Sequence, residues 1–156
     1  RLNGQCAIAV SEAVEGSLLR PGQALIAPGD HHMRVVRRGA AACVTLDQSP
    51  HENSCRPAVD PLFRSVAEIY GSAALAVILT GMGHDGQRGC EHIRARGGRV
   101  FIQDEATSVV WGMPGFVARA GLASELLPLD RIAPAIERRV RRSAAARPAP
   151  TARSLR

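Results

Sequence analysis

The segment ILTGMGHDGQRG, residues 78–89, follows an apolar run and has the composition of a strand end, a tight turn and the start of a helix. It contains a literal G-x-G-x-x-G, formed by Gly81, Gly83 and Gly86. In open α/β sheets, functional groups collect at the carboxyl ends of the strands, where a turn of this kind lies. The segment therefore predicts an α/β fold and locates the first candidate site.

Strands and helices alternate along the chain around this turn. The continuous apolar run 74–79 predicts a strand that is covered on both faces, and residues 100–103 predict the next strand. Apolar spacing and end signals, with Asp60 as the cap of the first helix, predict helices over residues 60–71, 86–96, 105–111, 114–120 and 129–142. The alternation is typical of a layered α/β fold with a mostly parallel sheet.

An antiparallel ribbon is predicted before the first of these helices. A short strand is expected over residues 7–10, and a second over 23–27. Pro28-Gly29-Asp30 has the chemistry of a turn, so residues 33–37 are expected to return along the second strand. Residues 41–46, which alternate in polarity, extend the ribbon.

Composition narrows the class of protein. The 156 residues are 46% apolar and only 3% aromatic, so a single domain with an aliphatic core is expected. No apolar run is long enough to span a membrane, and no secretory leader is recognised, so a cytoplasmic protein is expected. Residues 143–156, rich in Ala, Arg and Pro, are predicted to be a disordered tail.

The net charge of +6 does not indicate nucleic-acid binding. Residues 138–156 carry seven Arg and no acid, and the rest of the chain carries 13 Arg against 14 acidic residues. A domain that binds a polyanion is expected to carry its basic stripe on the folded body. We therefore expect no nucleic-acid partner.

The cysteines are spaced too widely for a C-x-x-C pair, at Cys6, Cys43, Cys55 and Cys90. Since disulfide frameworks belong to small, Cys-dense secreted chains, buried free thiols are predicted. A zinc site built from His51, Cys55 and the His31-His32 pair has no recognisable ligand spacing, so no metal is expected.

Three interpretations of the glycine turn are open from its residues alone. The first is a dinucleotide-binding loop: the turn follows a buried strand and opens a helix, and Asp104 follows Gly86 by 18 residues, near the place of a ribose-binding acid. Asp85 argues against this, because a carboxylate in the loop repels a pyrophosphate. Asp85 is alternatively the acid that orients a catalytic His, or a cap of the following helix.

Several longer motifs occur in one order along the chain: RLN at 1–3, IAPGDHHM at 26–33, ILTGMGHDG at 78–86 and QDEATSVVWGMP at 103–114. With these motifs the chain resembles, over residues 1 to about 136, the catalytic domain of the chemotaxis protein-glutamate methylesterases. The resemblance implies a serine hydrolase on a doubly wound, three-layer α/β sheet flanked by helices, with an antiparallel ribbon. Residues 1–142 are then expected to be the C-terminal part of that domain.

What the resemblance implies for function is specific. Such enzymes hydrolyse glutamyl methyl esters on chemoreceptors, and part of the family deamidates glutamines. The acid of the Ser-His-Asp triad maps onto Asp85, and an oxyanion donor maps onto the backbone N–H of Met82. No cofactor is implied, methyl-accepting chemotaxis receptors are the expected partners, and a regulatory receiver domain is expected upstream.

The triad Ser and His of the family belong to segments that precede its R-L-N motif, which is residues 1–3 here. We therefore expect this chain to be truncated before them and to be inactive by itself. A replacement triad from the available His and Ser residues is not expected. Two alternatives remain: a dinucleotide-binding module that uses Gly81, Gly83 and Gly86, and a receptor-binding remnant without catalysis.

Overall fold

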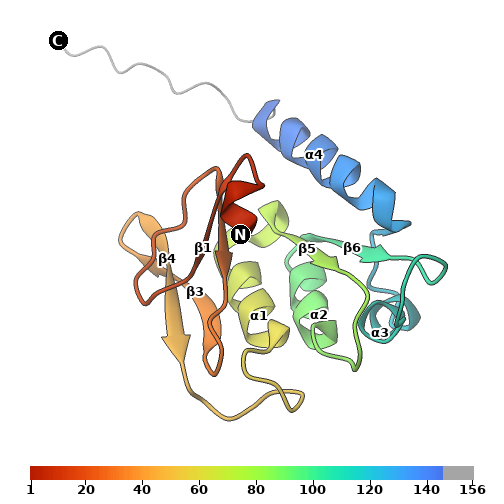
Figure 1. The fold of residues 1–156 in the computed structure, drawn as a ribbon, viewed down its shortest axis with the longest axis horizontal. Helices are drawn as coiled ribbons and strands as arrows, with labels where there is room; N and C mark the ends of the chain where they lie inside the picture. Colours follow the sequence, from red (N-terminus) through yellow and green to blue (C-terminus); the bar gives the residue numbers. More distant parts are fainter. Residues whose placement is uncertain (146–156) are drawn as a thin grey trace.

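The computed structural model describes residues 1–145, which fold into three small sheets and their flanking helices (Figure 1). Strands β1 (Ala9–Glu12) and β2 (Gln23–Ile26) form a parallel pair, and β3 (His32–Arg38) and β4 (Ala41–Asp47) form an antiparallel one. The third sheet is parallel, in the order β5-β6-β7, with β5 at Leu75–Ile78, β6 at Arg99–Gln103 and β7 at Glu125–Leu127.

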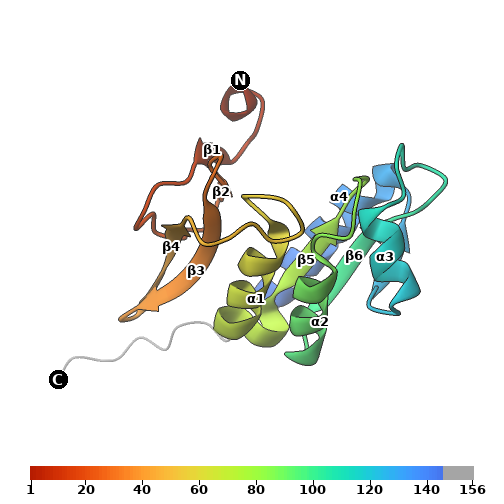
Figure 2. The same cartoon turned by 90° about the horizontal axis from the view of Figure 1, so that it is seen from below.

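Helices cover both faces of the three-stranded sheet. Helix α4 (Leu129–Ala145) lies on one face, and α2 (Gln87–Ala95) lies on the other (Figure 1). Helix α3 (Met113–Arg119) packs on β6 and α2, and α1 (Val59–Tyr70) lies between α2 and the β3–β4 ribbon (Figure 2). The predicted α/β fold with parallel sheets flanked by helices is confirmed.

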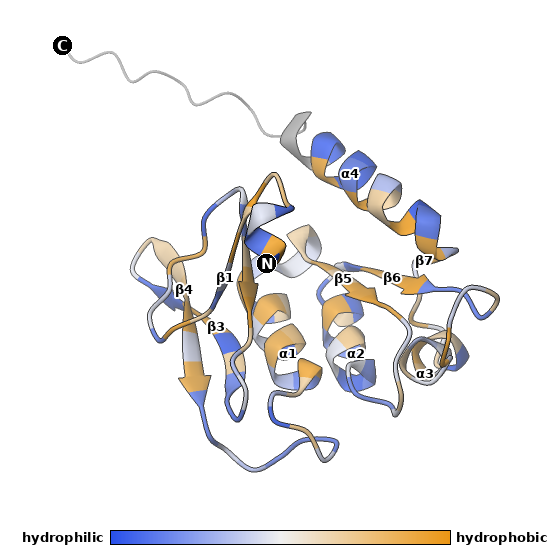
Figure 3. Ribbon diagram, viewed as in Figure 1, coloured by the Kyte–Doolittle hydropathy of each residue, from blue (hydrophilic) through white to orange (hydrophobic). Residues whose placement is uncertain are grey.

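The main core lies between β5, β6 and the helices α1, α2 and α3. Strands β5 and β6 are hydrophobic along most of their length (Figure 3), which is the expected pattern for strands covered on both faces. Val100 and Ile102 of β6 are fully buried against Ile93 and Cys90 of α2. This core fixes the carboxyl end of β5, from which the glycine turn starts.

The path of the ribbon differs from the prediction. Strands β3 and β4 are antiparallel, as predicted, but β3 does not return along β2, which pairs in parallel with β1. The turn residue Asp30 explains the difference: its N–H donates to Arg56 O, and its carboxylate accepts two hydrogen bonds from the Arg56 guanidinium. The turn is therefore held by a distant loop rather than closed as a hairpin.

The predicted helix over 105–111 is absent, because the polar side chains at its start bind the backbone in turns. Asp104 Oδ1 accepts the N–H of Thr107 at 3.0 Å, and the Ser108 hydroxyl donates to Asp104 O at 2.6 Å. The other predicted helices form, with ends displaced by a few residues.

Helix α4 is described as far as Ala145, so the prediction of a disordered tail is wrong for residues 143–145, and residues 146–156 of that tail lie outside the described residues. Within residues 1–145, no helix combines the length and the apolar character that a bilayer crossing requires.

Candidate functional site

Two glycines make the turn after β5 tight. Gly83 and Gly86 have φ values of +85° and +88°, a left-handed conformation that side chains rarely adopt. A Cβ on Gly86 would also lie 2.9 Å from Ile78 Cδ1 and 3.3 Å from Val59 Cγ1. Both glycines are therefore needed for the backbone path, and Gly86 is also needed for close packing against Val59 of α1.

The carboxylate of Asp85 lies at the start of α1. Its Oδ2 accepts the N–H of Val59 at 2.7 Å, and its Oδ1 accepts the N–H of Asp60 at 3.2 Å. Oδ1 also accepts the N–H of Gly86 at 2.9 Å and the side-chain amide of Asn53 at 2.8 Å. Asp85 therefore caps α1, which is not the following helix, and its charge matches the positive end of the α1 dipole.

This arrangement weakens the dinucleotide interpretation. A pyrophosphate needs free backbone N–H groups at the helix start. The N–H of Gly86 already donates to Asp85, and that of Gln87 donates to His84 O at 3.2 Å. Asp104, the candidate ribose ligand, holds Thr107 instead.

Asp60 was predicted to cap α1, and this is wrong. It lies inside the first turn, only 1% exposed, and no cap hydrogen bond comes from its side chain. Its Oδ1 accepts the N–H of Gly89 on α2 at 2.7 Å, and its Oδ2 accepts Asn53 Nδ2 at 2.9 Å. Asn53 thus contacts both Asp60 and Asp85, a role that no local sequence pattern indicates.

His32 completes the support of the α1 start. Its ring is fully buried, Nδ1 lies 3.2 Å from the N–H of Ala58, and Nε2 lies 3.1 Å from Pro50 O. Because Nδ1 must accept from that N–H, Nε2 carries the proton and donates to Pro50 O. Side chains therefore bind the N–H groups of three consecutive residues, Ala58, Val59 and Asp60.

No histidine of residues 1–145 forms a hydrogen bond with Asp85. His32 is occupied by the backbone, and the ring of His84 packs edge-on against Phe116, with the ring centroids 5.7 Å apart. Oδ1 of Asp85 accepts three hydrogen bonds, whereas Oδ2 accepts one. The partly exposed carboxylate therefore retains an acceptor position on Oδ2.

Met82 lies on the outside of the same turn, with its side chain 84% exposed. Its neighbour Gly81 donates to Val110 O at 3.1 Å and accepts the N–H of Met113 at 2.8 Å. Gly112 packs against this turn so closely that a Cβ there would lie 2.5 Å from Gly81 O. The N–H of Met82 has no acceptor among the residues that the structure describes.

Gln103 ties the ends of β5 and β6 together. Its fully buried amide accepts the N–H of Thr80 at 2.8 Å and donates to Thr107 O at 2.7 Å. The hydroxyl of Thr80 in turn exchanges hydrogen bonds with the backbone of Val110. The glycine turn and the 104–112 loop therefore form one rigid unit.

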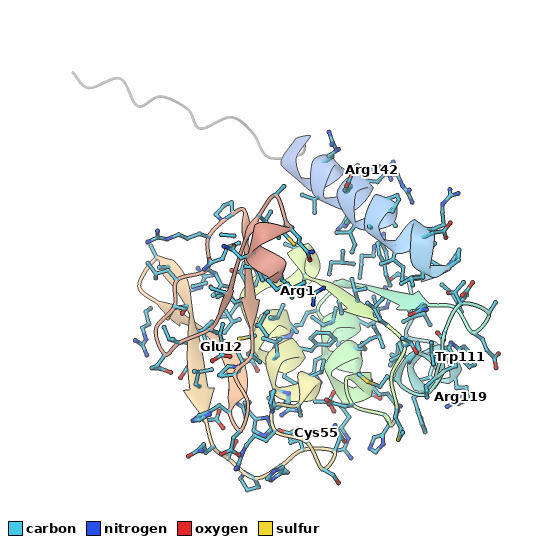
Figure 4. All side chains as sticks on the ribbon, viewed as in Figure 1. Arg1, Glu12, Cys55, Trp111, Arg119 and Arg142 are labelled. Carbon is cyan, nitrogen blue, oxygen red and sulfur yellow. The ribbon has the colours of Figure 1, made fainter. Side chains whose placement is uncertain are left out.

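The surface beside this unit is apolar and cationic. The side chains of Met82, Val109, Val110 and Phe116 are exposed. Arg119 lies over the Phe116 ring, with Cζ 4.6 Å from its centroid, and 5.9 Å from the centroid of the Trp111 ring (Figure 4).

The thiols and the polar groups near the site do not assemble a metal centre. All four cysteines are free, but only Cys43 and Cys90 are buried; Cys6 and Cys55 are exposed, contrary to the prediction that all are buried. Burial raises the pKa of the Cys90 thiol to about 12. Residues 1–145 contain no group of three His, Cys, Asp or Glu side chains placed to hold a metal ion.

The family model of the CheB methylesterases matches residues 1–136. The chain belongs to the CheB methylesterase family. In structure it resembles the catalytic domain of the CheB methylesterase of Thermotoga maritima, with a TM-score of 0.84 and 39% identity, over 90% of this chain and 72% of that one.

Curated relatives carry the name protein-glutamate methylesterase/protein-glutamine glutaminase. The relative from Trichodesmium erythraeum is 54% identical over 140 residues, which are 90% of this chain and 40% of the relative. The relative from Rhodospirillum centenum is 54% identical over 141 residues, 90% of this chain and 36% of the relative. The chain therefore spans about two fifths of the length of these relatives.

Proposed function

We propose that this chain supplies the triad acid, Asp85, and an oxyanion donor, the Met82 N–H, to a protein-glutamate methylesterase of bacterial chemotaxis. The substrates are glutamyl methyl esters on chemoreceptors, with glutamine deamidation as a second reaction of the same site. The observation that carries the proposal is the Asp85 carboxylate, which is fixed through Oδ1 and keeps an acceptor position on Oδ2.

In the proposed reaction a histidine donates Nδ1–H to Asp85 Oδ2, which fixes its tautomer and stabilises the imidazolium formed during attack. A serine hydroxyl attacks the ester carbonyl while the histidine takes its proton. The oxyanion of the tetrahedral intermediate accepts a hydrogen bond from the Met82 N–H. The C–O bond to the methoxy group then breaks, and the histidine returns the proton to give methanol.

Water completes the cycle by attacking the acyl-enzyme. The histidine takes a proton from the water and returns it to the serine, which releases the glutamate carboxylate. The serine and the histidine of this proposal come from sequence outside these 156 residues, so the chain alone has no esterase activity. Two facts support this part: the chain covers 72% of the similar catalytic domain, and none of its described histidines reaches Asp85.

Partners and location belong to the same proposal. Methyl-accepting chemotaxis receptors are the expected partners, and a regulatory receiver domain is expected upstream. The names of the curated relatives support methyl-ester hydrolysis and glutamine deamidation on a protein substrate. We place the enzyme in the cytoplasm, where the exposed free thiols Cys6 and Cys55 would stay reduced.

The test is Asp85→Asn in the full-length protein that contains this chain, with methanol release from a methylated receptor as the assay. Replacing the triad acid of a serine protease by its amide costs about 10⁴ in rate, so a comparable fall in kcat is expected. Because an amide at this position loses the bond from Val59 or from Asn53, a thermal melt must accompany the assay. Near-normal turnover in the folded variant would refute the assignment.

A further inference from the structure

We infer that Asn53 is a positioning residue for Asp85, one that separates its carboxylate from the buried carboxylate of Asp60. The inference rests on the proposed role of Asp85. One nitrogen, Asn53 Nδ2, donates to Asp85 Oδ1 at 2.8 Å and to Asp60 Oδ2 at 2.9 Å. An NH₂ group has two hydrogens, so each carboxylate receives one of them.

The backbone at Asn53 is adapted to this task. Its φ is +53°, in the left-handed region that Asn tolerates better than other residues with a side chain. The adjacent Ser54 is also left-handed, with φ +62°. Such conformations cost free energy and persist where the surrounding structure holds them. Here the conformation turns the Asn53 amide toward the two carboxylates.

The two carboxylates are both acceptors. Asp60, which is 1% exposed, accepts through Oδ1 from the Gly89 N–H and through Oδ2 from Asn53. Asp85 accepts four hydrogen bonds. Because both accept from the same nitrogen, the two acids lie close together, and a donor between them offsets the repulsion between like charges in a partly buried site.

The nearest cation does not replace this donor. Arg64 of α1 has a raised pKa chiefly because it donates to Glu52, and Asp60 and Asp85 add a smaller effect through charge alone. Its guanidinium is committed to Glu52 by hydrogen bonds of 2.9 and 2.5 Å. Among the described residues, Asn53 is therefore the side-chain donor that contacts both acids.

Asn53 affects the reaction by orienting the Asp85 carboxylate. With Asn53 present, Oδ1 is held by three donors, and Oδ2 accepts only the Val59 N–H and keeps an acceptor position for the histidine. Without it, repulsion from Asp60 would rotate or displace the Asp85 carboxylate. The imidazole would then lose its alignment, which affects the chemical step and leaves receptor binding unchanged.

The experiment uses the full-length protein and Asn53→Gly, because glycine adopts φ +53° without strain while it removes the amide. We expect kcat to fall roughly 10–100-fold, the range found when outer partners of site ligands are removed, and KM to stay within about twofold. The matched control is Gln48→Ala, which removes an amide-to-carboxylate bond of 2.9 Å to Asp30, an acid that Asn53 does not contact. Its kcat should equal that of the unmodified enzyme.

Charge substitutions separate positioning from general support of the fold. Asp60→Asn in the Asn53→Gly background removes the repelling charge and should restore most of kcat. In the otherwise unmodified enzyme, Asp60→Asn replaces an acceptor of the Asn53 amide with a second amide NH₂ group. Because two donors then face each other, kcat should fall. Asn53→Asp, which also tolerates the left-handed backbone, adds a third carboxylate and should be less active than Asn53→Gly.

The outcomes distinguish this inference from the proposed function. If Asp85→Asn is fully active, the triad assignment fails and the role of Asn53 fails with it. If Asp85→Asn is inactive while Asn53→Gly keeps normal kcat, only the inference is overturned. A loss of kcat in Asn53→Gly that Asp60→Asn does not relieve would also overturn the inference. If Asn53→Gly does not fold, Asn53→Asp takes its place: Asp60→Asn should again restore kcat, and a failure to do so would overturn the inference.

Discussion

Gly89 of α2 donates its N–H to Asp60 Oδ1 of α1, and the two helices touch at this point. A Cβ on Gly89 would lie 2.5 Å from Phe63 Cβ and 3.2 Å from Asp60 Oδ1. The absence of a side chain thus allows α2 to approach α1 closely enough to bind a buried acid. The position of Asp60, and through Asn53 that of Asp85, depends on this contact.

Gly89→Ala should lower the stability of the protein. Alanine gains up to about 1 kcal/mol of helix propensity over glycine, but forcing a methyl group into this contact costs about 1–3 kcal/mol. Because Phe63 Cβ is close to its own backbone, the neighbour has little room to move. A thermal melt should show a lower Tm. Gly29→Ala is the control, since a Cβ at Gly29 has no atom within 4 Å; equal melting of the two variants would contradict the prediction.

His32→Ala should destabilise the loop that leads into α1. The variant leaves the buried Ala58 N–H without its acceptor, which costs about 1–3 kcal/mol for an unsatisfied buried group, and it also removes the hydrogen bond to Pro50 O. Denaturant unfolding should therefore give a clearly lower midpoint. His31→Ala removes the neighbouring, partly exposed histidine, whose ring makes one exposed bond to Gly29 O, and should change little. A similar loss in both variants would show that the bonds of His32 are unimportant.

Stability should fall with acidity partly through Glu52. Hydrogen bonds from the Arg64 guanidinium hold the pKa of Glu52 below its ordinary value of 4.5. The pair therefore stabilises the fold above about pH 4.5, and the contribution is lost as the pH falls through the lower folded pKa. Because both side chains are partly exposed, Glu52→Gln should cost at most about 1 kcal/mol at pH 7. Thermal melts at several pH values should show the Tm values of the two proteins converging in acid. A Tm difference that stays constant with pH would show that ionisation of Glu52 is not the cause.

Gly112→Ala should impair the reaction more than the fold. A Cβ at Gly112 would lie 2.5 Å from Gly81 O, 3.1 Å from Gly83 N and 3.2 Å from Met82 Cα, all of them backbone atoms that cannot rotate away. The turn must shift, and a displacement of about 1 Å in a site costs roughly 10²-fold in rate. Methanol release by the full-length variant, compared with that of Gly29→Ala, measures the effect. Normal kcat would mean that the Met82 N–H is not used.

The four thiols should fall into two classes of reactivity. Cys6 and Cys55 are exposed and should react with a disulfide reagent in the native protein at pH 8. Cys43 is buried, and burial raises the pKa of the Cys90 thiol to about 12, so both should react only after unfolding. Mass spectrometry of the labelled protein identifies the modified residues, and rapid native labelling of Cys90 would contradict its burial.

Local sequence pattern was sufficient to predict the strand and the helix on either side of the glycine turn. The apolar run before Gly81 forms β5, and the helix that follows Gly86 runs from Gln87 to Ala95, as the sequence predicts. Positive φ at Gly83 and Gly86 agrees with a tight turn. These features depend on residues that are neighbours in the sequence, which is why a single sequence is enough to predict them.

The contacts of Asp85 were beyond local pattern. An acid just before a helix normally caps that helix, yet Asp85 binds the N–H groups of Val59 and Asp60, which precede it by about 25 residues. Asp60 has the sequence position of a cap and is used instead as a buried acceptor for Gly89. In both cases tertiary packing decides between partners that are equally suitable chemically.

Because Asp85 caps α1, binding of a partner to its carboxylate can be detected at a backbone amide of the helix, without measuring turnover. The Val59 N–H donates to Asp85 Oδ2, the oxygen that has room for another hydrogen bond. When the catalytic histidine donates to Oδ2, it must draw electron density away from the Val59 hydrogen bond. The amide resonance of Val59 in a nitrogen-proton correlation spectrum would then move on docking, while that of Asp60, bound to the saturated Oδ1, would move less. A backbone nucleus in a helix can thus report whether the acid is engaged, in the resting protein and before any substrate is added.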